Sequence, residues 1–130
     1  MKRLLVPLLM AVAGCGPDFE KLCSETHACE GGNDEDEKAC VVELDYRRDV
    51  ADIVGCTSEL DAYYDCLIEH ATCRMDSLGL TCTTSSVCGL GGQCINGTCQ
   101  FKSYGLEDPD VCEAEDNAYD HCSDFIGGIP

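Results

Sequence analysis

The chain has 130 residues, of which 13 are cysteine, and its formal net charge is −17. From Cys15 onward, Leu, Ile, Val and Phe supply only 22 of 116 residues, or 19%, and the formal charge is −19. Such a chain stays disordered unless disulfides hold it, and disulfides persist only outside a reducing cytosol. The composition therefore excludes a cytosolic protein with a large apolar core, and the negative charge excludes nucleic acid as a partner.

The first 14 residues have the layout of a secretory signal peptide. Lys2 and Arg3 precede an apolar run from Leu4 to Ala13, which is shorter than the roughly 20 residues of a membrane-spanning helix. The run closes with Val12-Ala13-Gly14-Cys15, which resembles the bacterial lipobox. The resemblance implies cleavage between Gly14 and Cys15, a diacylglyceryl thioether on Cys15, and a lipid anchor in a bacterial membrane.

Ordinary secretion is the alternative, because Ala11-Val12-Ala13 also fits a signal-peptidase site. The cysteine count favours lipidation, since an odd total of 13 becomes an even twelve once Cys15 carries lipid. The residue after Cys15 is Gly16, where an inner-membrane retention signal usually has aspartate. By that analogy the expected location is the outer membrane.

Two helices are predicted after the anchor. Asp18 is a suitable N-cap for the first helix, which ends at Gly31-Gly32. Asp34 and Glu37 resemble a capping box that begins the second helix, which ends at Gly55. Its predicted inward positions recur at helical spacing and are Cys40, Val41, Leu44, Arg47, Ala51 and Val54.

Two further helices follow. Ser58 with Asp61 is expected to cap the third helix, which the apolar spacing extends to near Cys73. Asp108-Pro109 is an N-cap followed by Pro at the first helical position, and this fourth helix, whose stripe includes Phe125 and Ile126, is expected to stop at Gly127-Gly128.

The third and fourth helices contain a repeat. Residues 56–66 and 112–122 share Cys, Glu, Ala, Tyr and Cys at identical offsets. One interpretation is a duplicated docking surface carried by Tyr63 and Tyr119. We favour a duplicated packing unit, with Ala and Tyr on the buried stripe between bridges, because both tyrosines fall on apolar helix faces.

Residues 78–101 differ in composition from the predicted helices, because they are rich in Gly, Ser and Thr, carry few charges and do not suit a helix. Asn96-Gly97 between β-favouring residues predicts a tight hairpin. The spacing of Cys82, Cys88, Cys94 and Cys99 resembles small knotted inserts of the Dickkopf N-terminal cysteine-rich type. That resemblance implies first-to-third and second-to-fourth pairing, which gives Cys82–Cys94 and Cys88–Cys99, and it implies no signalling activity.

The other eight cysteines allow 105 connectivities, which sequence alone does not resolve. We expect each helical hairpin to be bridged across its own pair, with Cys29–Cys40 joining the first two helices and Cys73–Cys112 closing the loop that carries the β insert. The predicted helical segment contains the short motifs Gly-Cys, Asp-Ala-Tyr and Ala-Thr-Cys, and in these it is similar to small cysteine-rich lipoproteins of myxobacterial type. That family implies no specific activity.

The residues that a metal or catalytic site would use have simpler interpretations. Zinc or thioredoxin-like chemistry is not expected, because the chain has no Cys-x-x-Cys and oxidised cysteines are neither ligands nor nucleophiles. His27, His70 and His121 are interpreted as solvated histidines. The run Asp34-Glu35-Asp36-Glu37 lacks the ligand pattern and glycine of an EF-hand and suits a helix N-terminus.

The sequence thus predicts a small, disulfide-rich, mainly α fold of helical hairpins with an inserted disulfide-knotted β-hairpin. The expected divisions are a signal peptide (1–14), an anchor and tether (15–17), a helical segment (18–77), a β insert (78–104) and a C-terminal helix (105–130). We expect no enzyme, cofactor or metal site. The predicted disulfide cysteines are Cys23, Cys29, Cys40, Cys56, Cys66, Cys73, Cys82, Cys88, Cys94, Cys99, Cys112 and Cys122.

The expected function is that of a membrane-anchored surface lipoprotein of structural or interaction type. Its partners would be the membrane, through lipidated Cys15, and a protein on the acidic face around Asp34 to Glu37. Two alternatives remain open at this stage. One is a weak divalent-cation binder, and the other is a small secreted inhibitor or toxin-like protein that uses the β insert.

Overall fold

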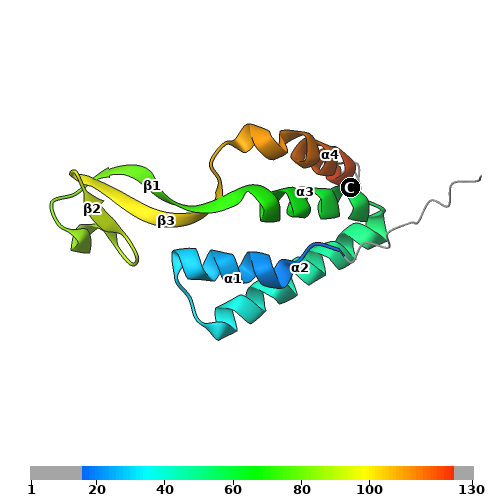
Figure 1. Ribbon diagram of the computed structural model, residues 1–130, viewed down its shortest axis with the longest axis horizontal. Coiled ribbons are helices and arrows are strands. Elements are labelled where there is room, and N and C mark those ends of the chain that lie inside the picture. The colour runs from blue at the N-terminus through cyan, green and yellow to red at the C-terminus, as the bar shows by residue number, and fades with distance from the viewer. Residues whose placement is uncertain (1–15, 125–130) are drawn as a thin grey trace, which may run out of the picture.

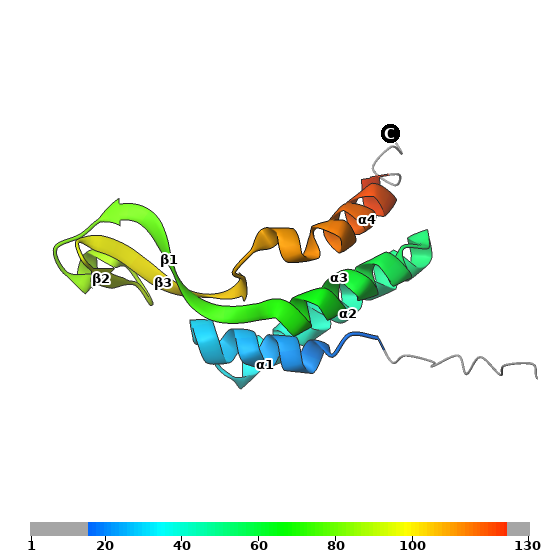
Figure 2. The same ribbon diagram turned by 45° about the horizontal axis from the view of Figure 1, so that its top comes forward.

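The computed structural model describes residues 16–124, and helices account for most of these residues (Figure 1). The elements in chain order are α1 (Phe19–Glu30), α2 (Asp34–Val54), α3 (Thr57–His70), β1 (Ala71–Thr81), the 3₁₀ turn η1 (Ser85–Cys88), β2 (Gln93–Ile95), β3 (Thr98–Leu106), η2 (Pro109–Cys112) and α4 (Glu113–Asp124). We call α1 to α4 the helical body, and β1 to β3 with η1 the β module. Both views show the β module projecting from one end of the helical body (Figures 1 and 2).

The cap at Asp18 is confirmed, and the cap of α2 lies one residue earlier than predicted. Asp108 is a cap as predicted, but of the 3₁₀ turn η2, which leads into α4 at Glu113. Asp18 accepts a hydrogen bond from the backbone N–H of Lys21, at 2.9 Å, and Asp108 accepts one from Asp110, at 3.0 Å. In α2, the N-cap is Asn33, which forms a capping box with Asp36. The correction has a local cause: Asn33 is still in an extended conformation after the two glycines, whereas Asp34 is already helical.

The predicted start and end of α3 are both wrong. Cys56 is the N-cap and makes no side-chain cap bond. The residues expected to cap have other partners, because the hydroxyl of Ser58 donates to Glu59 and Asp61 binds Arg48. The helix ends at His70, before Cys73, since the next residues pair as β1 with β3. That pairing is made between distant parts of the chain, which helical spacing does not detect. The predicted stop of α4 at Gly127-Gly128, with Phe125 and Ile126, lies outside the described residues.

The sheet has strand order β1-β3-β2 and is antiparallel throughout. The predicted hairpin at Asn96-Gly97 is confirmed: φ is 53° at Asn96 and 78° at Gly97, and the pair connects β2 to β3. Strand β1 was not predicted. It pairs with β3 from Ala71 opposite Leu106 to Ser77 opposite Gln100, so the sheet begins in the segment expected to be helical.

Six disulfides join all twelve cysteines that follow Cys15: Cys23–Cys40, Cys29–Cys73, Cys56–Cys122, Cys66–Cys112, Cys82–Cys94 and Cys88–Cys99. The two pairings expected in the β module are confirmed. The expected Cys29–Cys40 and Cys73–Cys112 pairings are wrong. Residues six apart on a helix point in different directions, so Cys23 reaches α2 while Cys29 reaches β1.

The two regions have separate cores. The helical body is packed around Phe19, Leu22, Ala51, Leu60 and Tyr64, and the ring of Phe19 meets that of Tyr64 edge-on at 5.2 Å. The β module buries Cys82, Cys88 and Cys99, with Cys94 and Phe101 packed against them. Its core therefore consists mainly of disulfides.

Candidate functional site

The sequence repeat forms an antiparallel pair of helices with near-twofold symmetry. The first cysteine of each copy is bonded to the last cysteine of the other, as Cys56–Cys122 and Cys66–Cys112. Tyr63 and Tyr119 occupy equivalent positions and stack with ring centroids 6.4 Å apart and planes 8° from parallel. Both tyrosines pack against the core of the helical body, so the packing interpretation is confirmed for them.

The alanines of the repeat do not follow that interpretation. Ala62 and Ala118 were expected on the buried stripe, but both are exposed. They line a hollow of about 310 Å³ together with Ser58, Glu59, Ala114 and Glu115. Each residue of α3 in this hollow has its repeat equivalent opposite it on α4, so the hollow shares the symmetry of the repeat and carries one glutamate from each copy.

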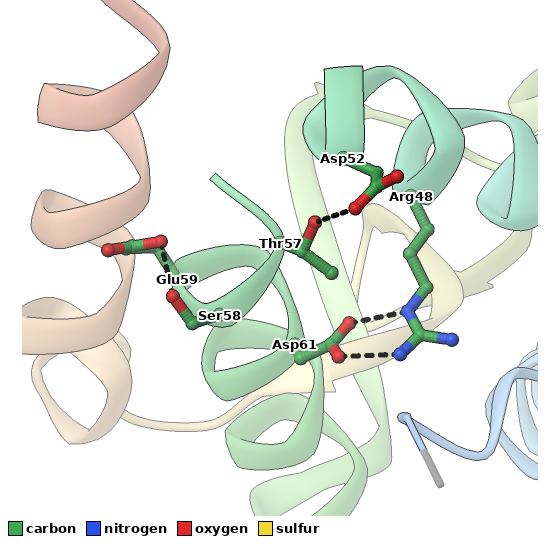
Figure 3. Close-up of polar contacts among 6 residues, drawn as sticks. All are labelled: Arg48, Asp52, Thr57, Ser58, Glu59 and Asp61. Atoms are coloured by element: carbon green, nitrogen blue, oxygen red, sulfur yellow. Dashed lines mark hydrogen bonds and ion pairs between the residues drawn. The ribbon is translucent and has the colours of Figure 1, made fainter. Parts of the chain in front are cut away.

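An ion pair joins α2 to α3 beside the N-terminal end of the described chain. The guanidinium of Arg48 donates from Nε and Nη2 to the two carboxylate oxygens of Asp61, both at 2.8 Å (Figure 3). These hydrogen bonds raise the pKa of Arg48 above its usual value. Gly16 lies directly against this guanidinium, because a Cβ built on Gly16 would be 2.2 Å from Arg48 Cζ. Pro17 is buried, so the segment next to Cys15 is packed onto the helical body. Cys15 itself lies outside the described residues.

A second junction connects α1 to the β module. The backbone N–H of Tyr104 donates to Glu30 at 2.9 Å, and the phenol of Tyr104 donates to Glu25. Burial and the neighbouring Glu25 carboxylate raise the pKa of Tyr104 to about 12. Together with the Cys29–Cys73 disulfide, these contacts fix the orientation of the sheet relative to α1.

Helix α2 carries an exposed apolar row that the sequence reasoning missed. Its members are Val42, Tyr46, Val50 and Ile53, with exposed fractions of 67%, 67%, 40% and 83%. We call this row the outer stripe. The available signal was a second set of apolar residues at i, i+4, i+8 and i+11, opposite the inward set. Arg47, assigned to the inward set, is instead exposed and paired with Glu43 at 2.6 Å.

Two hollows adjoin α2. One, of about 430 Å³, lies at the N-terminal half of the helix and is lined by Glu20, Glu37, Lys38, Val41 and Val42. The other, of about 270 Å³, lies at the C-terminal half and is lined by Arg48, Asp49, Asp52 and Thr57. The hydroxyl of Thr57 is 3.4 Å from a carboxylate oxygen of Asp52 (Figure 3). Acidic side chains contribute to the walls of both.

The acidic run and the histidines are not gathered into one site. Asp34, Glu35 and Asp36 are exposed on the first turn of α2, and Asp36 is used by the capping box. His27 is half-buried, and Gly32 approaches it so closely that a Cβ there would lie 2.0 Å from Nδ1.

His70 and His121 are exposed near the ends of α3 and α4. Within residues 16–124, the one group of three potential ligand atoms within 4.8 Å of one another belongs to Cys82, Cys88 and Cys99, all of which are in disulfides.

Comparisons of the chain with protein-family models, with curated proteins and with solved structures found no match. Among the helices of residues 16–124, none combines the length and the apolar character that crossing a membrane requires.

Proposed function

We propose that the chain is an exported bacterial lipoprotein, anchored through Cys15 after removal of residues 1–14, whose folded body acts as a non-enzymatic structural or interaction module on the membrane surface. The outer membrane is the proposed location. The β module is proposed to be a knotted insert of the Dickkopf N-terminal type within a frame similar to myxobacterial cysteine-rich lipoproteins.

The cysteine pairing is the observation that carries the proposal. Each of the twelve cysteines after Cys15 is bonded to another of the twelve. The sulfur of Cys15 is therefore the one that the disulfide framework does not require. Its position at the end of Val12-Ala13-Gly14-Cys15 suits the thioether that a lipoprotein carries.

The placement of the β module also supports a surface role. Gly16 and Pro17 are packed against the helical body, so a lipid on Cys15 would hold that body next to the bilayer. The β module projects from the opposite end of the body from residues 16–18 (Figure 2). In an anchored molecule it would therefore be directed away from the membrane.

Membrane fractionation tests the anchor. In the wild-type chain we expect extraction only with detergent, and an intact mass that lacks residues 1–14 and includes acyl chains. Cys15→Ser should move the protein to the soluble fraction, whereas Ser24→Ala, a change of an exposed side chain on α1, should leave it in the membrane. Detergent-dependent extraction of Cys15→Ser would refute the lipid anchor.

A further inference from the structure

Helix α2 has two apolar faces, and only one of them is covered by the helical body. Of its 21 residues, Ala51 alone is buried, and Leu44 and Val54 pack against the same core. The outer stripe lies on the other side. Its ends, Val42 and Ile53, are about 16 Å apart along the axis at 1.5 Å per residue, which is three helical turns. Apolar side chains exposed singly need no explanation, whereas a contiguous exposed row such as this one is the form that interaction surfaces take.

One edge of the outer stripe is strongly acidic. Asp45, Asp49 and Asp52 follow one another at i, i+4 and i+7 and are exposed. In the described part of the chain none of them forms an ion pair, because Arg47 binds Glu43 and Arg48 binds Asp61. Arg48 is near enough to Asp45 and Asp52 to feel their charge, but its hydrogen bonds go to Asp61, so a surface that meets the outer stripe would face three carboxylates without ion-pair partners along one side.

The acidic edge distinguishes between three occupants of the outer stripe: a second copy of the chain, an anionic bilayer and a basic amphipathic helix. In an antiparallel pair with a second copy, the acidic edge would lie against its own symmetry mate, and the two chains would each carry a formal charge of −17. An anionic bilayer is repelled for the same reason. An amphipathic helix with basic residues beside its apolar face satisfies both the row and its acidic edge.

The hollow at the N-terminal half of α2 gives such a helix a further contact. Val41 and Val42 provide apolar lining, and the two carboxylates of Glu20 and Glu37 outnumber the one ammonium group of Lys38, within about 430 Å³. This combination suits a Lys or Arg side chain, whose aliphatic stem packs on apolar surface while its charged head reaches a carboxylate.

We propose that the outer stripe is a docking site for a basic amphipathic helix of a partner protein. Its apolar face packs on Val42, Tyr46, Val50 and Ile53, and its cationic side chains lie along Asp45, Asp49 and Asp52. The inference rests on the interaction role in the proposed function and names the surface and the partner class. It does not depend on acylation of Cys15.

The test is binding of a model peptide to the full-length chain as recovered from its host, in zwitterionic nanodiscs if it is anchored and in solution if it is not. The peptide has about 18 residues, roughly 27 Å as a helix, with Leu and Ala on one face and Lys and Arg beside it. Its controls are a scrambled peptide of identical composition and a peptide with every Lys and Arg replaced by Glu. We expect saturable binding of the first peptide alone, measured by fluorescence anisotropy.

Surface variants locate the binding. Tyr46→Ser combined with Ile53→Ser should weaken the affinity about tenfold or more, because central apolar contacts carry most of the energy of such an interface. Both residues are exposed, so the thermal transition should be unchanged. The matched control is Leu90→Ser, which changes an equally apolar and fully exposed residue of the β module and should leave the affinity unchanged. Asp45→Asn with Asp49→Asn should reduce the dependence of the affinity on salt.

Several results would overturn the proposal. They are absence of binding, equal binding of the scrambled peptide, and equal loss in Leu90→Ser. A dimer in sedimentation that Tyr46→Ser/Ile53→Ser abolishes would assign the outer stripe to a second copy. If the wild-type protein binds zwitterionic vesicles that contain no protein, and the Tyr46→Ser/Ile53→Ser variant does not, the outer stripe would be assigned to lipid. Peptide binding that appears only after deletion of residues 125–130 would assign it to the chain's own C-terminal segment. A soluble Cys15→Ser variant bears on the anchor alone, so the two proposals fail separately.

Discussion

The helical body and the β module use disulfides in different ways. In the helical body, Leu60 is completely buried among Phe19, Leu22, Ala51 and Tyr64, and bridges are added to that apolar core. In the β module the buried residues are cysteines, with Phe101 packed beside them. Disulfides therefore reinforce one region and constitute the core of the other, which means that equal numbers of lost bridges should have unequal effects.

The largest expected effect is the removal of both bridges of the β module. Replacing Cys82, Cys94, Cys88 and Cys99 by Ser should abolish the amide hydrogen-exchange protection of β2 and of the part of β3 that pairs with it, since little apolar surface remains to order them. The helical circular dichroism should persist. Removing Cys56–Cys122 from the helical body should instead lower the free energy of unfolding by about 2–4 kcal/mol and preserve a cooperative transition. Similar outcomes in the two regions would contradict the comparison.

A core substitution tests whether the helical body, unlike the β module, depends on buried apolar side chains. Leu60→Ala should lower the free energy of unfolding by about 2–5 kcal/mol in denaturant titration of the oxidised protein, because it leaves a cavity at a fully buried position. Leu80→Ala is the matched control in the β module. Leu80 is 56% exposed, and its removal should change the stability by no more than about 0.5 kcal/mol. Equal destabilisation by the two changes would show that the β module has an apolar core after all.

Only one residue of α2, Ala51, is buried, so the cap of this helix should matter measurably. Asn33→Ala should cost about 1 kcal/mol, because it removes the acceptor for the backbone N–H groups of Glu35 and Asp36. Asp34→Ala should cost only about 0.3 kcal/mol, from the lost interaction with the helix dipole. Chemical denaturation of the two variants checks the order. A larger effect at Asp34 would restore the cap predicted from the sequence.

The contact between the two regions has no expected effect on the pH dependence of stability at neutral pH and shows itself only at high pH. The pKa of Tyr104 is raised to about 12 by burial and by Glu25, whereas an unfolded tyrosine titrates near 10. The folded state therefore holds this proton more tightly. Its contribution to stability is complete below about pH 10 and is lost as the pH rises toward about 12.

Spectrophotometric titration checks the assignment of that proton. Tyr104→Phe should remove one tyrosine from the high-pH part of the curve and reduce the loss of stability between about pH 10 and 12. Glu25→Gln should lower the midpoint of Tyr104 without abolishing the shift, because burial remains. A curve that neither variant alters would contradict the role of this junction.

Features determined by neighbouring residues were predictable from the sequence. The caps at Asp18 and Asp108 and the Asn96-Gly97 turn each depend on a few consecutive residues. The pairing of β1 with β3, the partners of Cys23 and Cys29, and the end of α3 depend on segments that are far apart in the chain.

The candidate surfaces show the same division. The sequence repeat predicted that Tyr63 and Tyr119 pack in the interior, because both lie on apolar helix faces. It did not predict that their rings stack on each other, which depends on how the two helices pair. The outer stripe was missed because α2 has two apolar faces. Either face could have been the one that packs against the core, and only the neighbouring helices decide which one is buried. Val42 and Ile53 are as apolar as the residues that face the core, and periodicity alone does not say which set is covered.

The bridge pattern has a consequence for proteolysis. The six disulfides overlap along the chain so that every peptide bond between Cys23 and Cys122 lies within at least one cross-linked loop. A single cut anywhere in that range leaves one covalent molecule, and no fragment is released without reduction. If Cys15 is the membrane attachment, shedding of the body by one cleavage requires a cut between Cys15 and Cys23. That stretch contains buried Pro17 and the first turns of α1, so the segment at which the protein is vulnerable to release is also one that the fold protects.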